Sequence, residues 1–338
     1  MLNKAIIDLS LLKENVLNIK SKLNKKVKLN AVVKADAYGH GAEIIASSIY
    51  PYVDSYSVAL LEEGIALRQV GIDKEILLLI EPFENEIDRA VKYGMTFCVQ
   101  NAKIVKEIAK ASLKEGVISK IHIAVNTGMN REGVDSEREL HLLIQAVLKE
   151  KGVKLTGIYS HLACPEEKVQ LKKQVGKFLL AIKCARGYNN IVSHLSASGG
   201  YLQNLHFDMV RIGILLYGYK PFKSDYVNVT PIMKVYAPTI KTKNIKENSL
   251  FLYGEKVLGV KKTSTLIRYG YADGLPRQKG LDLTTNRCMD VSGINGKFNG
   301  YYPVLDGNAD VIAKEYGTIS YEVLVNASKR AEMIYKDE

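Results

Sequence analysis

Cysteine is scarce in this sequence, and its four occurrences are widely separated. None belongs to a C-x-x-C pair, which argues against a zinc site, and their spacing gives no sign of a disulfide framework. The six histidines also lack H-E-x-x-H or similar ligand spacing, so the sequence predicts no metal site. We expect reduced thiols at Cys98, Cys164, Cys184 and Cys288.

Long hydrophobic runs are absent as well. No segment approaches the ~20 apolar residues that a membrane-spanning helix needs. At the N-terminus, Lys4 and Asp8 interrupt the apolar residues of Met1 to Leu12, so this segment lacks the continuous core of a signal peptide. We expect a cytoplasmic protein without membrane contact.

Acidic residues are in the minority, with 36 Asp and Glu against 47 Lys and Arg, and the net charge is +11. A nucleic-acid surface is one explanation. However, the lysines are spread along helix-like segments instead of forming one basic arm with interleaved aromatic residues. A solvated basic surface is the better interpretation, and its positive field would favour an anionic cofactor or substrate. We expect no nucleic-acid partner.

Short apolar runs alternate with longer helical patterns as far as Leu216, in a chain of 338 residues that can hold one barrel and a smaller domain. Ser10 is expected to cap the first helix. Eight strand-then-helix units predict an α/β fold in which residues 1–225 form a (β/α)8 barrel, with an open doubly wound sheet as the alternative. The expected strands are Ala31 to Val33, Ser55 to Leu60, Glu75 to Ile80, Met95 to Val99, Lys120 to Val125, Leu155 to Tyr159, Ile191 to Leu195 and Met209 to Leu216.

Beyond about Lys220 the regular helical patterns stop. Ile232 to Ile245, Thr263 to Tyr271 and Tyr302 to Leu305 have the character of strands, and Gly- and Asn-rich turns separate them. Residues 226–338 are therefore predicted to form a second, mainly β domain.

One lysine, Lys34, stands at the end of the first buried strand, just before the turn that Gly39 and Gly41 indicate. In a parallel α/β fold this is the edge where ligands bind. A desolvated lysine has a lowered pKa and can act as a nucleophile or base, as Schiff-base chemistry requires. By spacing alone, an ordinary lysine that extends into solvent explains the position equally well.

The nine residues from Val33 to Gly41, VKADAYGHG, resemble the attachment signature for pyridoxal 5'-phosphate (PLP) in alanine racemases. Further segments of that family follow in its order over nearly the whole chain. The resemblance implies a PLP-dependent racemase that works as a head-to-tail homodimer with shared active sites. It also implies that Lys34 holds PLP as a Schiff base and acts as one catalytic base.

The second base implied by the resemblance is Tyr271, in the segment GYADG, which in the family reaches the active site of the partner subunit. A tyrosine is a poor base unless cations stabilise its phenolate, and a run from His161 to Arg211 could do so. An isolated His161 would more simply be a core residue, but the family has a histidine there, stacked near the cofactor. Arg211 would face the pyridine nitrogen, and because it cannot give up a proton the ring stays a weak electron sink, which suits proton exchange.

Other matching positions imply the contacts of the cofactor phosphate. They include Ser198, although Ala197 replaces the asparagine that usually precedes this serine. The expected phosphate contacts are the side chains of Tyr38, Ser198 and Tyr321 and the amides of Gly213 and Ile214.

For the substrate carboxylate, the resemblance implies Arg131 and the backbone at Met289. Two departures leave open what holds Arg131. Asn126 stands where the family usually has aspartate, and Ala124 stands where some members have a carbamylated lysine that supports this arginine.

The implied reaction is the interconversion of L- and D-alanine, which supplies D-alanine for peptidoglycan. A racemase for serine or basic amino acids would keep every motif, and a non-catalytic PLP-binding barrel is a further alternative, although a mere carrier would not need Tyr271. Between Val291 and Ile312 the chain does not match the family and is shortened, which predicts an altered β domain or dimer contact.

Overall fold

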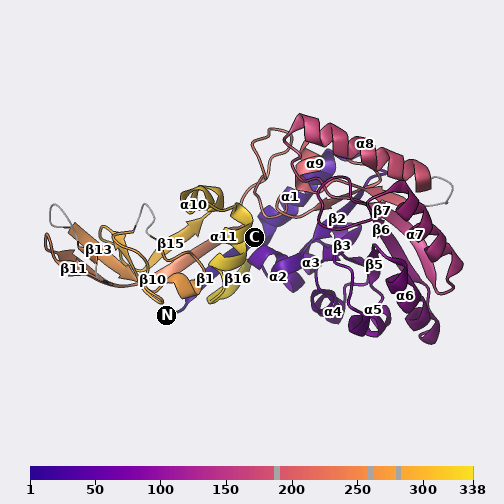
Figure 1. The fold of residues 1–338 in the computed structure, drawn as a ribbon. Helices are drawn as coiled ribbons and strands as arrows, with labels where there is room; N and C mark the ends of the chain where they lie inside the picture. The colour runs from indigo at the N-terminus through magenta and orange to yellow at the C-terminus, as the bar shows by residue number, and fades with distance from the viewer. Residues whose placement is uncertain (186–190, 254, 257–261, 279–282, 338) are drawn as a thin grey trace.

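The computed structural model contains a barrel and an extended β domain (Figure 1). It describes residues 1–338 except 186–190, 254, 257–261, 279–282 and 338. In the described part of the chain, no helix combines the length and the apolar composition that crossing a membrane would need.

Eight parallel strands form the barrel sheet, in the spatial order β8, β7, β6, β5, β4, β3, β2, β9. Neighbours along the chain are neighbours in the sheet, as expected for right-handed strand-helix-strand crossovers. The strands are β2 (Lys28–Val32), β3 (Ser55–Val58), β4 (Glu75–Leu78), β5 (Thr96–Val99), β6 (Ser119–Ala124), β7 (Val153–Tyr159), β8 (Val192–His194) and β9 (Met209–Ile212).

The two ends of this sheet meet at β8 and β9. The Asp208 amide donates to the Ser193 carbonyl at 3.0 Å, and the Arg211 amide donates to the Ser196 carbonyl at 2.9 Å. The Asp208 carboxylate also accepts from the Ser193 amide and hydroxyl. The sheet is thus a nearly closed barrel, so the predicted (β/α)8 fold is confirmed and the open doubly wound sheet was the wrong alternative.

Helices surround the barrel strands, with α6, α7 and α8 along its outer side (Figure 1). The helix that precedes the first unit is capped by Asp8, whose carboxylate accepts from the Leu11 amide at 2.9 Å, so the expected cap at Ser10 was wrong by two residues. The helices are α1 (Leu9–Ser21), α3 (Ala42–Ile49), η1 (Tyr50–Tyr52), α4 (Leu61–Gln69), η2 (Glu84–Glu86), α5 (Ile87–Lys92), α6 (Ala102–Lys114), α7 (Glu137–Lys149), α8 (Lys168–Ala185) and α9 (Ser198–Leu202).

The second sheet has the order β14, β13, β10, β1, β16, and β15 also pairs with β10. The long strand β10 pairs with β1 and β15 through its first half and with β13 through its second. The predicted mainly β second domain is confirmed. Its strands are β1 (Asn3–Asp8), β10 (Met233–Ile245), β13 (Lys262–Ile267), β14 (Ser292–Asn295), β15 (Tyr301–Asp306) and β16 (Ala331–Lys336), and β11 (Leu250–Phe251) pairs separately with β12 (Glu255–Lys256).

Three features of the second domain were not expected. The first strand of the chain, β1, lies in this sheet between β10 and β16. The predicted domain boundary at residue 225 stays a prediction. The strand expected to reach Tyr271 ends at Ile267, and Tyr271 instead begins the short helix η3 (Tyr271–Asp273). Two helices, α10 (Ala309–Glu315) and α11 (Ser320–Ala327), follow β15.

One continuous apolar core extends from the barrel into the β domain. Ile7 of β1, Val235 of β10 and Leu324 of α11 are fully buried in the same cluster as the barrel strands. Because α11 packs against the segment that carries Lys34, the β domain helps to fix the position of that residue.

Candidate active site

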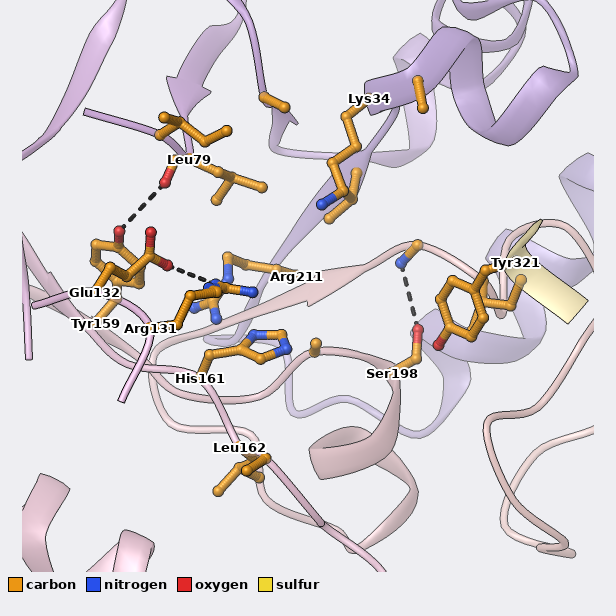
Figure 2. A pocket seen from close by; sticks show the side chains of 18 of the residues that line it. Lys34, Leu79, Arg131, Glu132, Tyr159, His161, Leu162, Ser198, Arg211 and Tyr321 are labelled. Carbon is orange, nitrogen blue, oxygen red and sulfur yellow. Dashed lines mark hydrogen bonds and ion pairs between the residues drawn. The ribbon is translucent and has the colours of Figure 1, made fainter. Parts of the chain in front are cut away.

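A cavity of about 1320 Å³ lies at the carboxyl ends of the barrel strands. Its walls come from the segments after all eight barrel strands and from α11 of the second domain. This volume exceeds the few hundred to ~1,000 Å³ of an ordinary small-molecule pocket, so it can hold a cofactor together with a small substrate. Figure 2 shows Lys34, Arg131, His161, Ser198, Arg211 and Tyr321 facing this space.

Lys34 lies one residue beyond β2 and begins an unusual turn, α2 (Lys34–Gly39). Residues 35–38 all have φ between 51 and 57°, so the turn is left-handed although none of the four is glycine. The hydrogen bonds that hold it include the Ala35 amide to Glu63 at 2.6 Å, the Ala42 amide to Asp36 at 2.7 Å, and the Ser328 hydroxyl to the Gly39 carbonyl at 2.8 Å. Strained backbone of this kind concentrates at functional sites.

The amine of Lys34 points into the cavity, between Arg211 and Ser198 (Figure 2). Burial lowers the pKa of Lys34, and the positive charge of Arg131 lowers it further, while Glu63 and Glu132 oppose the shift. Because only a neutral amine is nucleophilic, both effects favour covalent or proton-transfer chemistry at this lysine.

Arg211 forms the floor of the cavity and is buried. Its guanidinium donates to the carbonyls of His194 at 2.8 Å and Ser160 at 2.7 Å. Burial lowers the pKa of Arg211 to about 10, so it remains a cation at neutral pH. Burial, together with the positive charge of Arg211, lowers the pKa of His161 to about 3, so His161 is neutral.

A buried histidine pair lies behind Arg211. Arg211 Nη1 is 2.6 Å from His194 Nδ1, and His194 Nε2 is 2.9 Å from His122 Nδ1. Since a guanidinium only donates, His194 Nδ1 must accept, and its Nε2 then carries the proton and donates to His122. Glu75 follows at 4.0 Å from His122 Nε2. No role was expected for His122 or His194. The available signal in the sequence was an imidazole inside each of these apolar strands.

Hydroxyl and amide donors gather at the other end of the cavity. The Gly213 amide donates to Ser198 Oγ at 3.3 Å, and Tyr38, Ile214 and Tyr321 line the same end. Burial raises the pKa of both tyrosines, that of Tyr321 to about 12, so their phenols stay protonated at neutral pH. A Cβ on Gly213 would lie 2.4 Å from the Tyr38 hydroxyl, so only glycine fits there.

These features fit PLP. The donor cluster around Ser198 suits a phosphate, the Lys34 amine suits an aldehyde, and the buried guanidinium of Arg211 suits a ring nitrogen that accepts a hydrogen bond. No group of three or more His, Cys, Asp or Glu side chains in the described part of the chain is arranged to hold a metal ion.

Arg131 projects from the loop after β6, beside His161 (Figure 2), and its charge lowers the pKa of Lys34. Asn126 organises this loop, because its carbonyl oxygen accepts from the amides of Gly128 and Asn130, each at 3.0 Å. The Asn126 amide also donates to Asp135 at 2.6 Å. At position 126 an asparagine therefore uses both its carbonyl oxygen and its amide group to hold the loop that carries Arg131.

Two of the predicted site residues lie elsewhere. Tyr271 and Met289 are neighbours in the β domain, where the Ala272 amide donates to the Met289 carbonyl at 3.0 Å, and neither lines the cavity of Lys34. Both are partly exposed, Tyr271 at 38%. Within one chain the structure does not bring them to Lys34, and their role stays a prediction that requires a second subunit.

Comparison with known proteins agrees with this geometry. Residues 7–221 match the family described as "Alanine racemase, N-terminal domain". The alanine racemase of Clostridium tetani (strain Massachusetts / E88) is 33% identical, over 98% of this chain and 94% of that protein. This chain belongs to the alanine racemase family.

Solved structures of alanine racemases extend the likeness to the whole fold. The alanine racemase of Clostridium difficile 630 superposes with a TM-score of 0.93 at 29% identity, covering 100% of this chain and 96% of that one. The same enzyme in complex with cycloserine gives a TM-score of 0.89 at 28% identity, with the same coverage. The predicted membership of the alanine racemase family is confirmed.

Proposed function

We propose that this chain is a PLP-dependent alanine racemase that interconverts L- and D-alanine and supplies D-alanine for peptidoglycan. The observation that carries the proposal is the lysine with a lowered pKa, Lys34, placed in one cavity between a cluster of phosphate donors and a buried arginine. Relatives named alanine racemase align over nearly the whole chain, which favours this reaction over a carrier function.

When bound, PLP withdraws electrons from the α-carbon of the amino acid and makes its proton removable. We assign its phosphate to Ser198 and Tyr38, the amides of Gly213 and Ile214, and the phenol of Tyr321. Arg211 would donate a hydrogen bond to the pyridine nitrogen. Because Arg211 keeps its proton at neutral pH, it would leave the pyridine ring a weak electron sink. A weak sink favours simple proton exchange and limits side reactions such as transamination.

Inversion at the α-carbon needs a base on each face, since a single base tends to return the proton to the side from which it came. Lys34 Nζ takes or returns the proton on one face. The phenol of Tyr271 from a second copy of the chain does the same on the other. Arg131 and the backbone at Met289 bind the substrate carboxylate, and neutral His161 and cationic Arg211 support the phenolate.

A head-to-tail homodimer would bring Tyr271 to the cavity. Two features support it: Tyr271 is partly exposed away from its own cavity, and the cavity rim carries exposed apolar residues, Phe83 and Ile319. A covered rim would exclude water from the site. We place the protein in the cytoplasm, because its scattered cysteines suit a reducing compartment.

The test uses the full chain with PLP. We expect a visible absorption band from cofactor attached to Lys34, and loss of this band in Lys34→Ala. Racemisation is followed by circular dichroism from each enantiomer of alanine, serine and lysine, and faster turnover of alanine supports the proposal. Faster turnover of serine or lysine would identify the broader racemase instead, and no racemisation despite the band would identify a carrier.

The second base has its own test. We expect Tyr271→Phe to keep the absorption band and lose racemisation from both enantiomers, because only the phenol oxygen is removed. Undiminished rates in both directions would contradict the two-base assignment.

A further inference from the structure

Arg131 carries one ion pair in the described part of the chain, and its partner is the next residue. Arg131 Nη2 lies 2.5 Å from Glu132 Oε1 (Figure 2). The Arg131 side chain is half exposed, whereas that of Glu132 is only 23% exposed. The carboxylate is therefore the inner member of the pair, and the guanidinium extends from it into the cavity.

The surroundings of Glu132 belong to the site. Glu132 lines the cavity together with Tyr159 and Lys34. Its negative charge acts on Lys34 and on Arg211, and in both it opposes the fall in pKa that burial causes. Glu132 is thus an anion placed among three cations of the site, Lys34, Arg131 and Arg211.

The end of β6 offers no other support for Arg131. Ala124 is buried there and ends in a methyl group, which cannot bind a guanidinium. Ala124, Arg131, Glu132 and Tyr159 line a second void of about 10 Å³. That space holds roughly one water, so there is no room beside the Arg131 and Glu132 pair for a larger bound anion.

The loop backbone places Glu132 for this role. Gly133 has φ of 98°, and a Cβ there would lie 2.7 Å from the Asn126 nitrogen, so the chain turns sharply just after Glu132. The Gly133 amide donates to the Gln100 side chain at 2.8 Å. The pair uses Arg131 Nη2, which leaves Nη1 and Nε to donate to a carboxylate in the cavity.

We propose that Glu132 is the positioning residue that holds Arg131 toward the substrate carboxylate, in place of the modified lysine that supports this arginine in some members of the family. In this proposal Glu132 does not touch substrate: its hydrogen bond orients Arg131, and its charge also acts on Lys34 and Arg211. The inference rests on the proposed function, because it assigns Arg131 to the carboxylate of an amino acid.

The experiment compares Glu132→Leu, Glu132→Gln and a matched control, Glu62→Gln. Glu62 forms the same kind of pair with Arg89, at 2.6 and 3.0 Å, but on the exposed surface away from the cavity. Each full-length protein is loaded with PLP, and kcat and KM for alanine are measured from both enantiomers.

Glu132→Leu removes the acceptor that holds Arg131. Arg131 should then bind the carboxylate less well, and by the same amount in the bound substrate and in the transition state. We therefore expect KM to rise roughly three- to tenfold with kcat nearly unchanged. Glu132→Gln keeps an acceptor oxygen, so it should retain a KM between those of the wild type and Glu132→Leu. Glu62→Gln should behave as the wild type.

A second readout does not depend on turnover. Propionate has the carboxylate of alanine without its amine, and its Kd is measured by NMR titration. We expect Glu132→Leu to weaken propionate binding by the same factor as KM, whereas a merely structural role would lower thermal stability and leave this Kd unchanged. Unchanged KM and propionate Kd in Glu132→Leu, or a fall in kcat alone, would overturn the inference. If the wild type did not racemise alanine, the proposed function would fail while the propionate titration still decided the role of Glu132.

Discussion

The left-handed turn beside Lys34 predicts an unusual effect of glycine. Ala35 is exposed and has φ of 51° and ψ of 51°, so its methyl group makes few contacts but keeps the backbone in an unfavourable region. A non-glycine residue in the left-handed region costs ~1–2 kcal/mol, and substitution by glycine removes this cost. Glycine also increases the entropy of the unfolded chain, which offsets ~0.4–1 kcal/mol of the gain. We expect Ala35→Gly to raise the free energy of unfolding by about 0.5 to 1 kcal/mol.

The control lies in an ordinary helix. Ala146 is inside α7, where the backbone is right-handed, and Ala146→Gly should lower the free energy of unfolding by ~1 kcal/mol. Both variants are compared with the wild type by urea denaturation without PLP, because bound cofactor adds its own stabilisation. Destabilisation of Ala35→Gly to the same degree as Ala146→Gly would refute the reasoning.

Activity should change in the opposite direction. A glycine at position 35 lets the turn adopt right-handed conformations, so the Lys34 amine is held less firmly. We expect kcat of the PLP-loaded Ala35→Gly enzyme to fall roughly two- to fivefold, since small errors in placing a reacting group are costly. Equal kcat for this variant and the wild type would show that the turn does not position Lys34.

Two further predictions concern the cofactor site and pH. Gly213→Ala places a Cβ 2.4 Å from the Tyr38 hydroxyl, and such overpacking costs ~1–3 kcal/mol. The Kd for PLP, measured by fluorescence titration, should therefore rise about tenfold or more. An unchanged Kd would contradict the phosphate assignment. Burial lowers the pKa of both His40 and His122 to about 4, from 6.5 in the unfolded chain, so the unfolded state binds more protons between these values. Stability should therefore be complete above pH 6.5 and fall as the pH drops toward 4, by up to ~3 kcal/mol for each histidine. Urea denaturation across this window, with His40→Asn as a comparison, should show a smaller loss in the variant, and equal losses would argue against burial of a neutral His40.

Most barrel elements could be predicted because their signals are local. The predicted strands Lys120 to Val125 and Leu155 to Tyr159 agree with β6 and β7 to within about two residues, since apolar runs and flanking turns mark them in the sequence. The position of β1 could not be predicted in this way. Pairing of β1 with β10 and β16 joins residues more than 200 positions apart, which no local pattern records.

The candidate site shows the same division. Lys34 stands out because a reactive side chain ends an apolar strand, and the surrounding motif names its chemistry. Glu132 and His194 do not stand out, because their roles depend on what neighbouring strands place beside them. The Arg131 and Glu132 pair forms only when the loop turns at Gly133, and the contact between His194 and His122 requires the register of β6, β7 and β8.

The central place of β1 has a consequence for synthesis. On the ribosome the first strand is made long before its partners, since β10 begins at Met233 and β16 at Ala331. During this interval β1 has two unsatisfied edges while the barrel can already assemble beside it. The β domain can thus close only after β16 has been synthesised, when this strand pairs with the much earlier strand β1.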